Sequence, residues 1–200
     1  MECDSCRMVH LAPEYRLGAE DERARYETHK NVPSDPEYRA FLNRLAMPLM
    51  KRLLPGAEGL DYGSGPGPTL SLMLEELGFR MEIYDPYFAP DPASLERSYD
   101  FITCSETIEH FFRPDEEFAR LDRVLRPGGW LALMTEMIPK TASFENWYYP
   151  RDPTHVCFYR PATMEWLAAH LGAGLEFPHP NVVLLRKSPA NAVNDRTETT

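Results

Sequence analysis

Apolar side chains recur along this chain at two spacings, which predict helices alternating with strands. Between Tyr38 and Leu53 they return every three or four positions, so we expect a helix there. Ser34-Asp35-Pro36 is a typical helix start, and Pro55-Gly56 ends the run. Shorter patterns predict strands at 59–63, 80–84, 99–103, 129–137, 174–177 and 182–186, with further helices at 68–77, 114–125 and 161–171.

The order of these predicted elements favours an α/β fold. Strands alternate with helices, which is typical of a parallel sheet with helices on both of its faces. The last two strands are close enough along the chain to form a hairpin. Residues 1–34 are polar and irregular apart from helical potential at 19–29, and residues 188–200 lack periodicity. We therefore predict one domain at 35–187, an N-terminal arm at 1–34 and a disordered tail at 188–200.

A glycine-rich turn follows the first strand of this predicted domain. Residues 59–67 read Gly-Leu-Asp-Tyr-Gly-Ser-Gly-Pro-Gly, so an apolar lead-in ends at Asp61 and glycines follow at Gly63, Gly65 and Gly67. A strand, a glycine turn and a helix start form an arrangement in which the backbone can touch a bound cofactor. The same glycines also suit a purely structural turn.

Further motifs come after this turn in a fixed order. The second strand ends at Asp85, Glu109-His110 follows the third strand, and Leu125-Arg126-Pro127-Gly128-Gly129 precedes the fourth. A carboxylate at Asp85 can accept hydrogen bonds from both hydroxyls of a ribose, although a helix cap or a surface acid is the alternative. Together these motifs resemble the class I S-adenosylmethionine-dependent methyltransferases, nearest to the ubiquinone-biosynthesis type, over roughly residues 36–187.

The resemblance implies a fold, a cofactor and a set of binding residues. The fold is a Rossmann-like, doubly wound and mostly parallel sheet whose last strand is antiparallel. The cofactor is S-adenosylmethionine, with its methionine portion on the glycine turn, its ribose on Asp85 and its sulfonium near Ser105 and Glu106. The residues expected to bind it are Asp61, Gly63, Ser64, Gly65, Gly67, Asp85, Ser105 and Glu106.

One segment departs from the family pattern. Between Asp85 and Asp100 there is room only for a loop and about one helical turn, at 92–97. Family members usually place a further helix, a strand and an acidic adenine contact there, so we expect a sheet of about six strands. Tyr87 or Phe88 is then a candidate to stack on adenine, unless both serve only in packing.

Two histidines are candidates for a general base, which a hydroxyl acceptor requires. His155 lies in the segment where related enzymes build a cover over the acceptor, next to aromatic residues at 144–149, and Asp152 is placed to orient it. His110 ranks second. The alternative is that residues 144–159 form a packed connection. The chain has no Asn/Asp-Pro-Pro-Tyr motif, which argues against a DNA methylase, and no cluster of acids that would hold magnesium near the acceptor.

Composition narrows the function classes. The formal net charge of −10 argues against nucleic-acid binding, which draws on clustered lysine and arginine. No apolar run approaches the length that crosses a membrane, and the N-terminus lacks a signal-peptide pattern, so we expect a cytoplasmic protein. Cys104 and Cys157 read as core residues. Cys3 and Cys6 are weak zinc candidates, half of a possible zinc ribbon, because a structural zinc needs four ligands; otherwise no metal is predicted.

We therefore expect an enzyme that methylates an oxygen, nitrogen or carbon of a small molecule. A nicotinamide-dependent oxidoreductase is disfavoured because Pro68 stands where its third glycine is needed. A non-catalytic module on the same fold, which binds cofactor or a partner protein through the Cys3/Cys6 arm, remains the main alternative.

Overall fold

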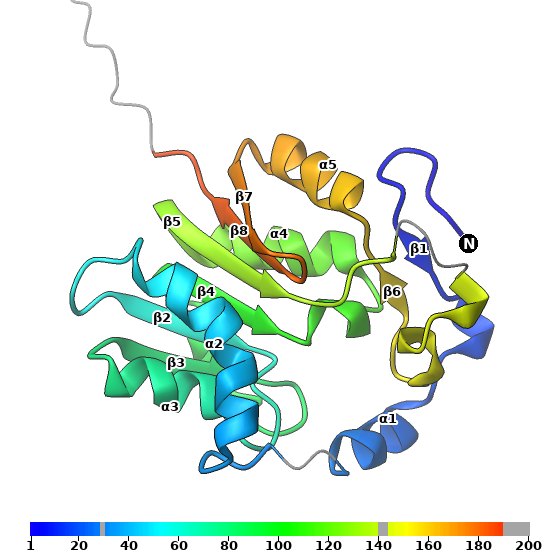
Figure 1. Ribbon diagram of the computed structural model, residues 1–200, viewed down its shortest axis with the longest axis horizontal. Coiled ribbons are helices and arrows are strands. Elements are labelled where there is room, and N and C mark those ends of the chain that lie inside the picture. The colour runs from blue at the N-terminus through cyan, green and yellow to red at the C-terminus, as the bar shows by residue number, and fades with distance from the viewer. Residues whose placement is uncertain (29–30, 140–143, 190–200) are drawn as a thin grey trace, which may run out of the picture.

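A computed structural model describes residues 1–28, 31–139 and 144–189 (Figure 1). Its centre is a sheet of six strands in the order β3-β2-β4-β5-β8-β7. β8 runs antiparallel to both of its neighbours, whereas the other strands are parallel to one another. The predicted fold class and the reduced sheet are thus confirmed. The strands are β2 (Glu58–Tyr62), β3 (Arg80–Tyr84), β4 (Tyr99–Ser105), β5 (Leu125–Met134), β7 (Gly174–His179) and β8 (Val182–Arg186).

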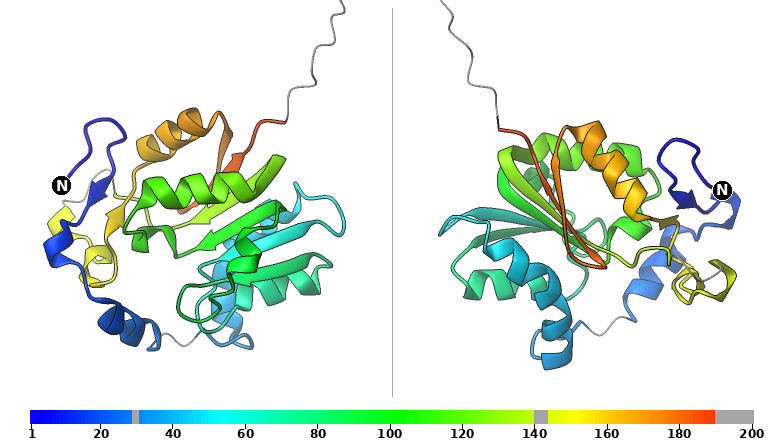
Figure 2. Two further views of the ribbon diagram at one scale, coloured as in Figure 1. Left: turned by 180° about the vertical axis from the view of Figure 1, so that it is seen from behind. Right: turned by 45° about the horizontal axis from the view of Figure 1, so that its top comes forward.

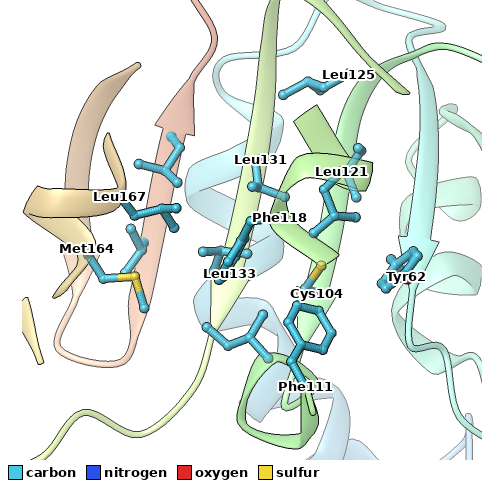
Figure 3. Packing of buried hydrophobic residues seen from close by; sticks show 14 of the residues in the cluster. Tyr62, Cys104, Phe111, Phe118, Leu121, Leu125, Leu131, Leu133, Met164 and Leu167 are labelled. Atoms are coloured by element: carbon cyan, nitrogen blue, oxygen red, sulfur yellow. The ribbon is translucent and has the colours of Figure 1, made fainter. Parts of the chain in front are cut away.

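Helices cover both faces of the sheet, and the strands β4, β5 and β8 alternate their side chains between two apolar clusters. In β5, Leu131 and Leu133 pack with α4 (Pro114–Val124) and α5 (Pro161–Leu171), as Figure 3 shows. Ala132 and Met134 point the other way, toward α2 (Pro36–Met50) and α3 (Thr69–Glu76). Figure 1 shows the sheet from the side of α2, and the left view of Figure 2 shows it from behind, with α4 in front. The core therefore consists of two apolar layers, one on each face of the sheet.

The start of α2 is set by the residues predicted to start it. The Asp35 carboxylate accepts hydrogen bonds from the backbone nitrogens of Glu37 at 2.9 Å and Tyr38 at 3.3 Å, and Pro36 occupies the first helical position. The helix ends at Met50, earlier than the apolar spacing predicts. Leu53 still packs against the α2 cluster, but from the turn that follows the helix.

The N-terminal arm is less irregular than predicted. β1 (Val9–His10) pairs antiparallel with β6 (Cys157–Phe158) and forms a small second sheet. α1 (Ala19–Tyr26) follows, so the helical potential at 19–29 is confirmed up to its last turn. Figure 1 shows α1 and β6 beyond the ends of the central strands. The predicted tail lies outside the described residues from position 190 onward, whereas Ser188 donates a hydrogen bond to the Gly172 carbonyl at 2.6 Å.

Candidate functional site

A cavity of about 1120 Å³ opens at the carboxyl-terminal ends of β2, β3 and β4. This is the edge where ligands bind in open α/β sheets. Its walls come from the glycine turn, the end of β3, the segment after β4, α1, and residues 148–155. The cavity brings together all the residues that the sequence predicted for the cofactor and both candidate bases: Asp61, Gly63, Ser64, Gly65, Gly67, Asp85, Ser105, Glu106, His110 and His155.

The glycine turn is built so that side chains are excluded from it. Gly63 and Gly65 have φ angles of +78° and +64°, which other residues adopt only with strain. A Cβ on Gly63 would lie 2.1 Å from Cγ2 of Thr107, and one on Gly67 would lie 2.2 Å from the Asn31 carbonyl oxygen. The turn therefore offers bare backbone to the cavity. Within the described chain, the buried hydroxyl of Ser64 has no hydrogen-bond partner.

Asp85 holds this turn against the end of β3. One carboxylate oxygen accepts a hydrogen bond from the Gly65 backbone nitrogen at 2.9 Å, and the other accepts from Tyr87 at 2.8 Å and Phe88 at 3.0 Å. The residue is 7% exposed. It thus caps the turn at 86–88, whereas the alternative left open by the sequence was the cap of a helix. Tyr87 and Phe88 both line the cavity, with their ring centroids 6.4 Å apart.

Asp61 lies beneath the turn as a buried carboxyl group. Its oxygen accepts a hydrogen bond from the Thr103 hydroxyl at 2.7 Å. Burial raises the pKa of Asp61 to about 6, the negative charge of Asp85 adds to the effect, and the Thr103 hydrogen bond opposes it. A cation near this carboxyl would favour its ionised form, because it would compensate the buried charge.

Glu106 begins a group of polar residues on the other side of the cavity. Its backbone has a φ of +49°, uncommon for a residue other than glycine, and is held by a hydrogen bond from its nitrogen to the Met134 carbonyl at 2.8 Å. The Tyr149 hydroxyl lies 3.2 Å from one carboxyl oxygen, and the other has no partner among the described residues. Burial, and next the charge of Glu109, raise the pKa of Glu106 to about 9.

The same tyrosine connects Glu106 to Glu109, a residue for which the sequence predicted no role of its own. The Tyr149 hydroxyl donates to Glu109 and lies 3.1 Å from the Thr135 hydroxyl. The side chain of Glu109 is fully buried, and its Oε2 has no hydrogen-bond partner in the described part of the chain. No local pattern points to this network, because Tyr149 lies 40 residues from Glu109 along the chain.

His110 and His155 lie face to edge, with ring centroids 4.9 Å apart. Nδ1 of His110 is 2.9 Å from the Thr154 carbonyl oxygen, and Nδ1 of His155 is 2.8 Å from the Tyr149 carbonyl oxygen. A carbonyl only accepts, so each Nδ1 carries the proton, and in the neutral ring the lone pair is on Nε2. Burial lowers the pKa of His155, although the charge of Glu109 opposes this, so the neutral form is favoured.

The residue expected to orient His155 has other partners. The Asp152 carboxylate pairs with Arg25 at 2.6 Å and accepts from the Thr154 hydroxyl at 2.7 Å. The backbone of Tyr149 orients the imidazole instead. Sequence proximity misled here because Asp152 faces α1.

α1 connects two sides of the cavity through Glu22, which is buried. Tyr87 donates a hydrogen bond to one oxygen of Glu22 at 2.6 Å, and Tyr26 donates to the other at 2.7 Å. Arg25, one turn further along, forms the ion pair with Asp152. The helix is therefore attached both to the loop after β3 and to the segment that carries His155. The sequence predicted the helix but not these contacts.

The remaining sequence candidates lie away from the cavity. Cys3 and Cys6 are free and partly exposed, and within residues 1–28, 31–139 and 144–189 neither joins a group of three metal-binding side chains. Cys104 and Cys157 are buried in the core, as predicted. In the described chain, no helix combines the length and apolarity needed to cross a bilayer.

Comparison with known proteins shows which family and which solved structures this chain is similar to. Residues 34–176 match the protein family described as "Methyltransferase domain". No curated protein sequence matches the chain. Among solved structures, a putative sarcosine dimethylglycine methyltransferase from Galdieria sulphuraria is 19% identical, with a TM-score of 0.58, and the match covers 79% of this chain and 74% of that one.

Two further structures share the fold. A protein from Pyrococcus horikoshii OT3 is 17% identical, with a TM-score of 0.54, and 82% of this chain and 97% of that chain are covered. Phosphoethanolamine N-methyltransferase 2 from Haemonchus contortus, in complex with S-adenosyl-L-methionine, is 18% identical with a TM-score of 0.53. The match covers 77% of this chain and 42% of that one.

Proposed function

Because this chain belongs to the methyltransferase-domain family, whose match spans residues 34–176, we propose that it methylates a small molecule bound beside Glu106, His110 and His155. The methyl donor is S-adenosylmethionine. The observation that carries the proposal is that one cavity contains both the glycine turn and the two histidines. It gives the donor and the acceptor a common space at the edge of the sheet where their reacting atoms can meet.

The residues on the donor side fit S-adenosylmethionine. Gly63 and Gly67 leave no room for a side chain, so at these positions the backbone itself lines the cavity. The Ser64 hydroxyl and one oxygen of Glu106, which have no hydrogen-bond partner among the described residues, supply polar groups that a ligand would satisfy. Asp61 and Asp85 supply acidic groups for a ligand that carries positive charge and a ribose. We assign the cofactor contacts to these residues and to Ser105.

When bound, S-adenosylmethionine supplies a methyl group on a sulfonium, so the acceptor atom bonds to the methyl carbon while sulfur keeps the electron pair of the broken bond. The chain's part is to align the acceptor with that bond and to exclude water. Tyr26, Tyr148 and Tyr149 line the acceptor side and give it apolar surface. α1, held by Arg25 and Glu22, covers the cavity.

We assign proton removal from a hydroxyl acceptor to His155, with His110 second. Neutral imidazole accepts a proton on Nε2, and the Tyr149 carbonyl, which accepts the hydrogen bond from Nδ1–H, stabilises the imidazolium that results. An amine acceptor attacks through its own lone pair and needs no base first. Whether the acceptor is a hydroxyl or an amine therefore decides whether His155 has to act as a base.

The first test is ligand binding. Calorimetry with S-adenosylmethionine, S-adenosylhomocysteine and NAD should give binding of the first two and none of the third. Acceptors are then sought by the release of S-adenosylhomocysteine from panels of phenols, other hydroxyl compounds and amines. Failure to bind either sulfur ligand would refute the proposed donor site.

Replacing His155 by alanine tests the catalytic assignment. We expect S-adenosylhomocysteine affinity to stay near that of the wild type, and turnover of a hydroxyl acceptor to fall by about 10²–10⁴-fold, the usual contribution of a general base. His170→Ala is the control, because His170 is exposed on α5 and stacks on Trp166. Unchanged turnover in His155→Ala would remove His155 as the base.

A further inference from the structure

We propose that Glu109, His110 and His155 bind a divalent transition-metal ion at the acceptor side of the cavity. One potential ligand atom from each of the three side chains lies within 4.8 Å of the other two. Within the described residues this is the only set of three such groups found. Two imidazoles and one carboxylate form a ligand set that binds first-row transition metals in preference to magnesium or calcium.

Both imidazoles are oriented as metal ligands usually are. A metal-bound histidine typically donates its other ring proton to a backbone carbonyl or a carboxylate, which fixes the tautomer and the ring plane. Here Nδ1 of His110 donates to the Thr154 carbonyl and Nδ1 of His155 donates to the Tyr149 carbonyl, at 2.9 and 2.8 Å. In both rings the lone pair is therefore carried by Nε2, which is the form that coordinates a metal ion.

The buried carboxylate of Glu109 is a second, independent observation that supports a cation site. Glu109 has no exposed surface, and its Oε2 has no hydrogen-bond partner among the residues described. A buried carboxylate that lacks a partner is costly, so such groups are usually paired or bind a metal. Among the described residues no hydrogen bond joins this oxygen to Glu106, so Glu106 does not relieve the cost. A divalent ion would compensate Glu109 and lie next to both imidazoles.

The three side chains are close enough to bind one ion after small movements. Ligand atoms at about 2.1 Å from a common ion lie roughly 3.0–3.5 Å apart, so the widest separation in the group must shorten by at most about 2 Å. A change in the Glu109 side-chain torsions and small shifts of the segments that carry the two rings supply that movement, and both Nδ1 hydrogen bonds are kept. Three protein ligands leave coordination positions open, as in catalytic metal sites. Because His110 and His155 line the cavity, the acceptor can reach those positions.

This site deepens the proposed function and rests on it, because the ion would hold the acceptor. An acceptor hydroxyl bound to the ion loses its proton to water more readily, since the positive charge stabilises the oxyanion. The oxyanion then attacks the methyl carbon, and sulfur keeps the electron pair of the broken bond. With the ion bound, His155 acts as a ligand; in the metal-free protein it keeps the role of base.

Cobalt(II) is a suitable probe, because coordination by imidazole gives it a visible absorption band. We expect one Co²⁺ to bind per chain, with the band abolished by excess Zn²⁺ but not by Mg²⁺. Glu109→Gln and His110→Ala should weaken Co²⁺ binding by about 10-fold or more, at least the loss seen when groups that support a metal site are removed. Glu116→Gln and His170→Ala, which change exposed residues of the same types, should bind Co²⁺ as the wild type does.

Binding of S-adenosylhomocysteine separates the metal proposal from the proposed function and also checks the fold. If the three-residue site exists, Glu109→Gln binds S-adenosylhomocysteine normally while losing Co²⁺. Equal Co²⁺ binding by the wild type and Glu109→Gln, or no binding by either, would overturn the metal site and leave methyl transfer intact. Should Glu109→Gln unfold, His110→Ala with the same two measurements decides. Loss of S-adenosylhomocysteine binding in the wild type would instead refute the donor site.

Discussion

The hydrogen bond between Gly65 and Asp85 is the contact on which the donor side of the cavity depends. It joins the glycine turn after β2 to the end of β3, across 20 residues of chain. The sequence predicted both residues as parts of one site, because each follows a strand and the ends of parallel strands meet at one edge. It gave no sign of the bond between them. The role of the carboxylate as a cap became visible only from its three backbone donors.

Replacing Gly65 by alanine should weaken S-adenosylhomocysteine binding by at least about 10-fold. Alanine at a positive φ is strained by roughly 1–2 kcal/mol, and here the strain shifts a backbone nitrogen that Asp85 holds in the cavity wall. Gly78→Ala is a matched control, because Gly78 also has a positive φ, of +88°, and open space around it. Calorimetry should show an affinity loss only in Gly65→Ala. Equal affinities in the two variants would contradict the assignment.

The network of polar residues around Tyr149 could not be predicted from single residues. His155 and His110 were recognised because histidine is chemically conspicuous, and Glu106 because it follows a strand in a known pattern. Glu109 and Thr135 were not, since an acid in a turn and a threonine in a strand are ordinary residues. Their role arises from one hydroxyl that approaches both, and that approach depends on the path of residues 144–159.

Among the elements, α1 makes contacts that its local pattern did not predict. Its helical spacing is plain, yet its buried acid, Glu22, accepts from Tyr87, a residue 65 positions away. β1 was missed for a related reason. It has two residues, too few for a periodic pattern, and its partner β6 lies near the other end of the chain. Elements with an internal period, such as α5, were predicted to the residue.

Breaking the ion pair between Arg25 and Asp152 should loosen the cover over the cavity. In Arg25→Gln we expect S-adenosylhomocysteine to dissociate about five-fold faster, because a partly buried pair contributes on the order of 1 kcal/mol. Amide hydrogen exchange in residues 19–26 should also accelerate. Arg23→Gln is the control on the same helix, since its pair with Glu27 is exposed on both sides. Identical dissociation rates for the two variants would show that α1 does not cover the bound ligand.

At the scale of the whole molecule, the sheet could be predicted because its strands repeat a regular alternation of side chains. β5 alternates between two clusters, so its pattern alone shows that both faces are covered. The short connection between Asp85 and Asp100 likewise fixed the number of strands. The division into an arm at 1–34 and a domain at 35–187 stays a prediction, and the pairing of β1 with β6 ties the two segments together.

The buried carboxyl of Asp61 should make global stability depend on pH. Its pKa is about 6 in the folded protein and about 3.9 when unfolded, so the folded state binds its proton more tightly. The resulting stability is full below about pH 4 and is lost as pH rises through 6. Asp61→Asn keeps an acceptor for Thr103 and removes this dependence. Relative to the wild type, it should gain on the order of 1–3 kcal/mol in unfolding free energy between about pH 4 and pH 7.

Urea unfolding at pH 4 and at pH 7 measures this difference. Asp100→Asn is the control, because the pKa of Asp100 is shifted in the opposite direction. Burial alone would raise the pKa of Asp100, but hydrogen bonds from the Glu58 backbone and from Arg126 outweigh it and lower the pKa. That carboxylate therefore adds stability above its unfolded pKa, and this contribution is lost as pH falls through its folded pKa. This contribution changes at and below the unfolded pKa of about 3.9, so between pH 4 and pH 7 the stability of Asp100→Asn relative to the wild type should change little. The same slope in both variants would contradict the assignment of Asp61.

The missing unit after Asp85 leaves β3 at the outer margin of the sheet, where in the described chain it pairs with β2 alone. A strand in that position is a template onto which another chain can add. β3 carries a charge at Arg80, paired with Glu58, and another at Glu82, paired with Arg97. Charged side chains on an outer strand oppose the addition of a further strand. The consequence for this chain is that Arg80 and Glu82 make β3 a poor template for such pairing.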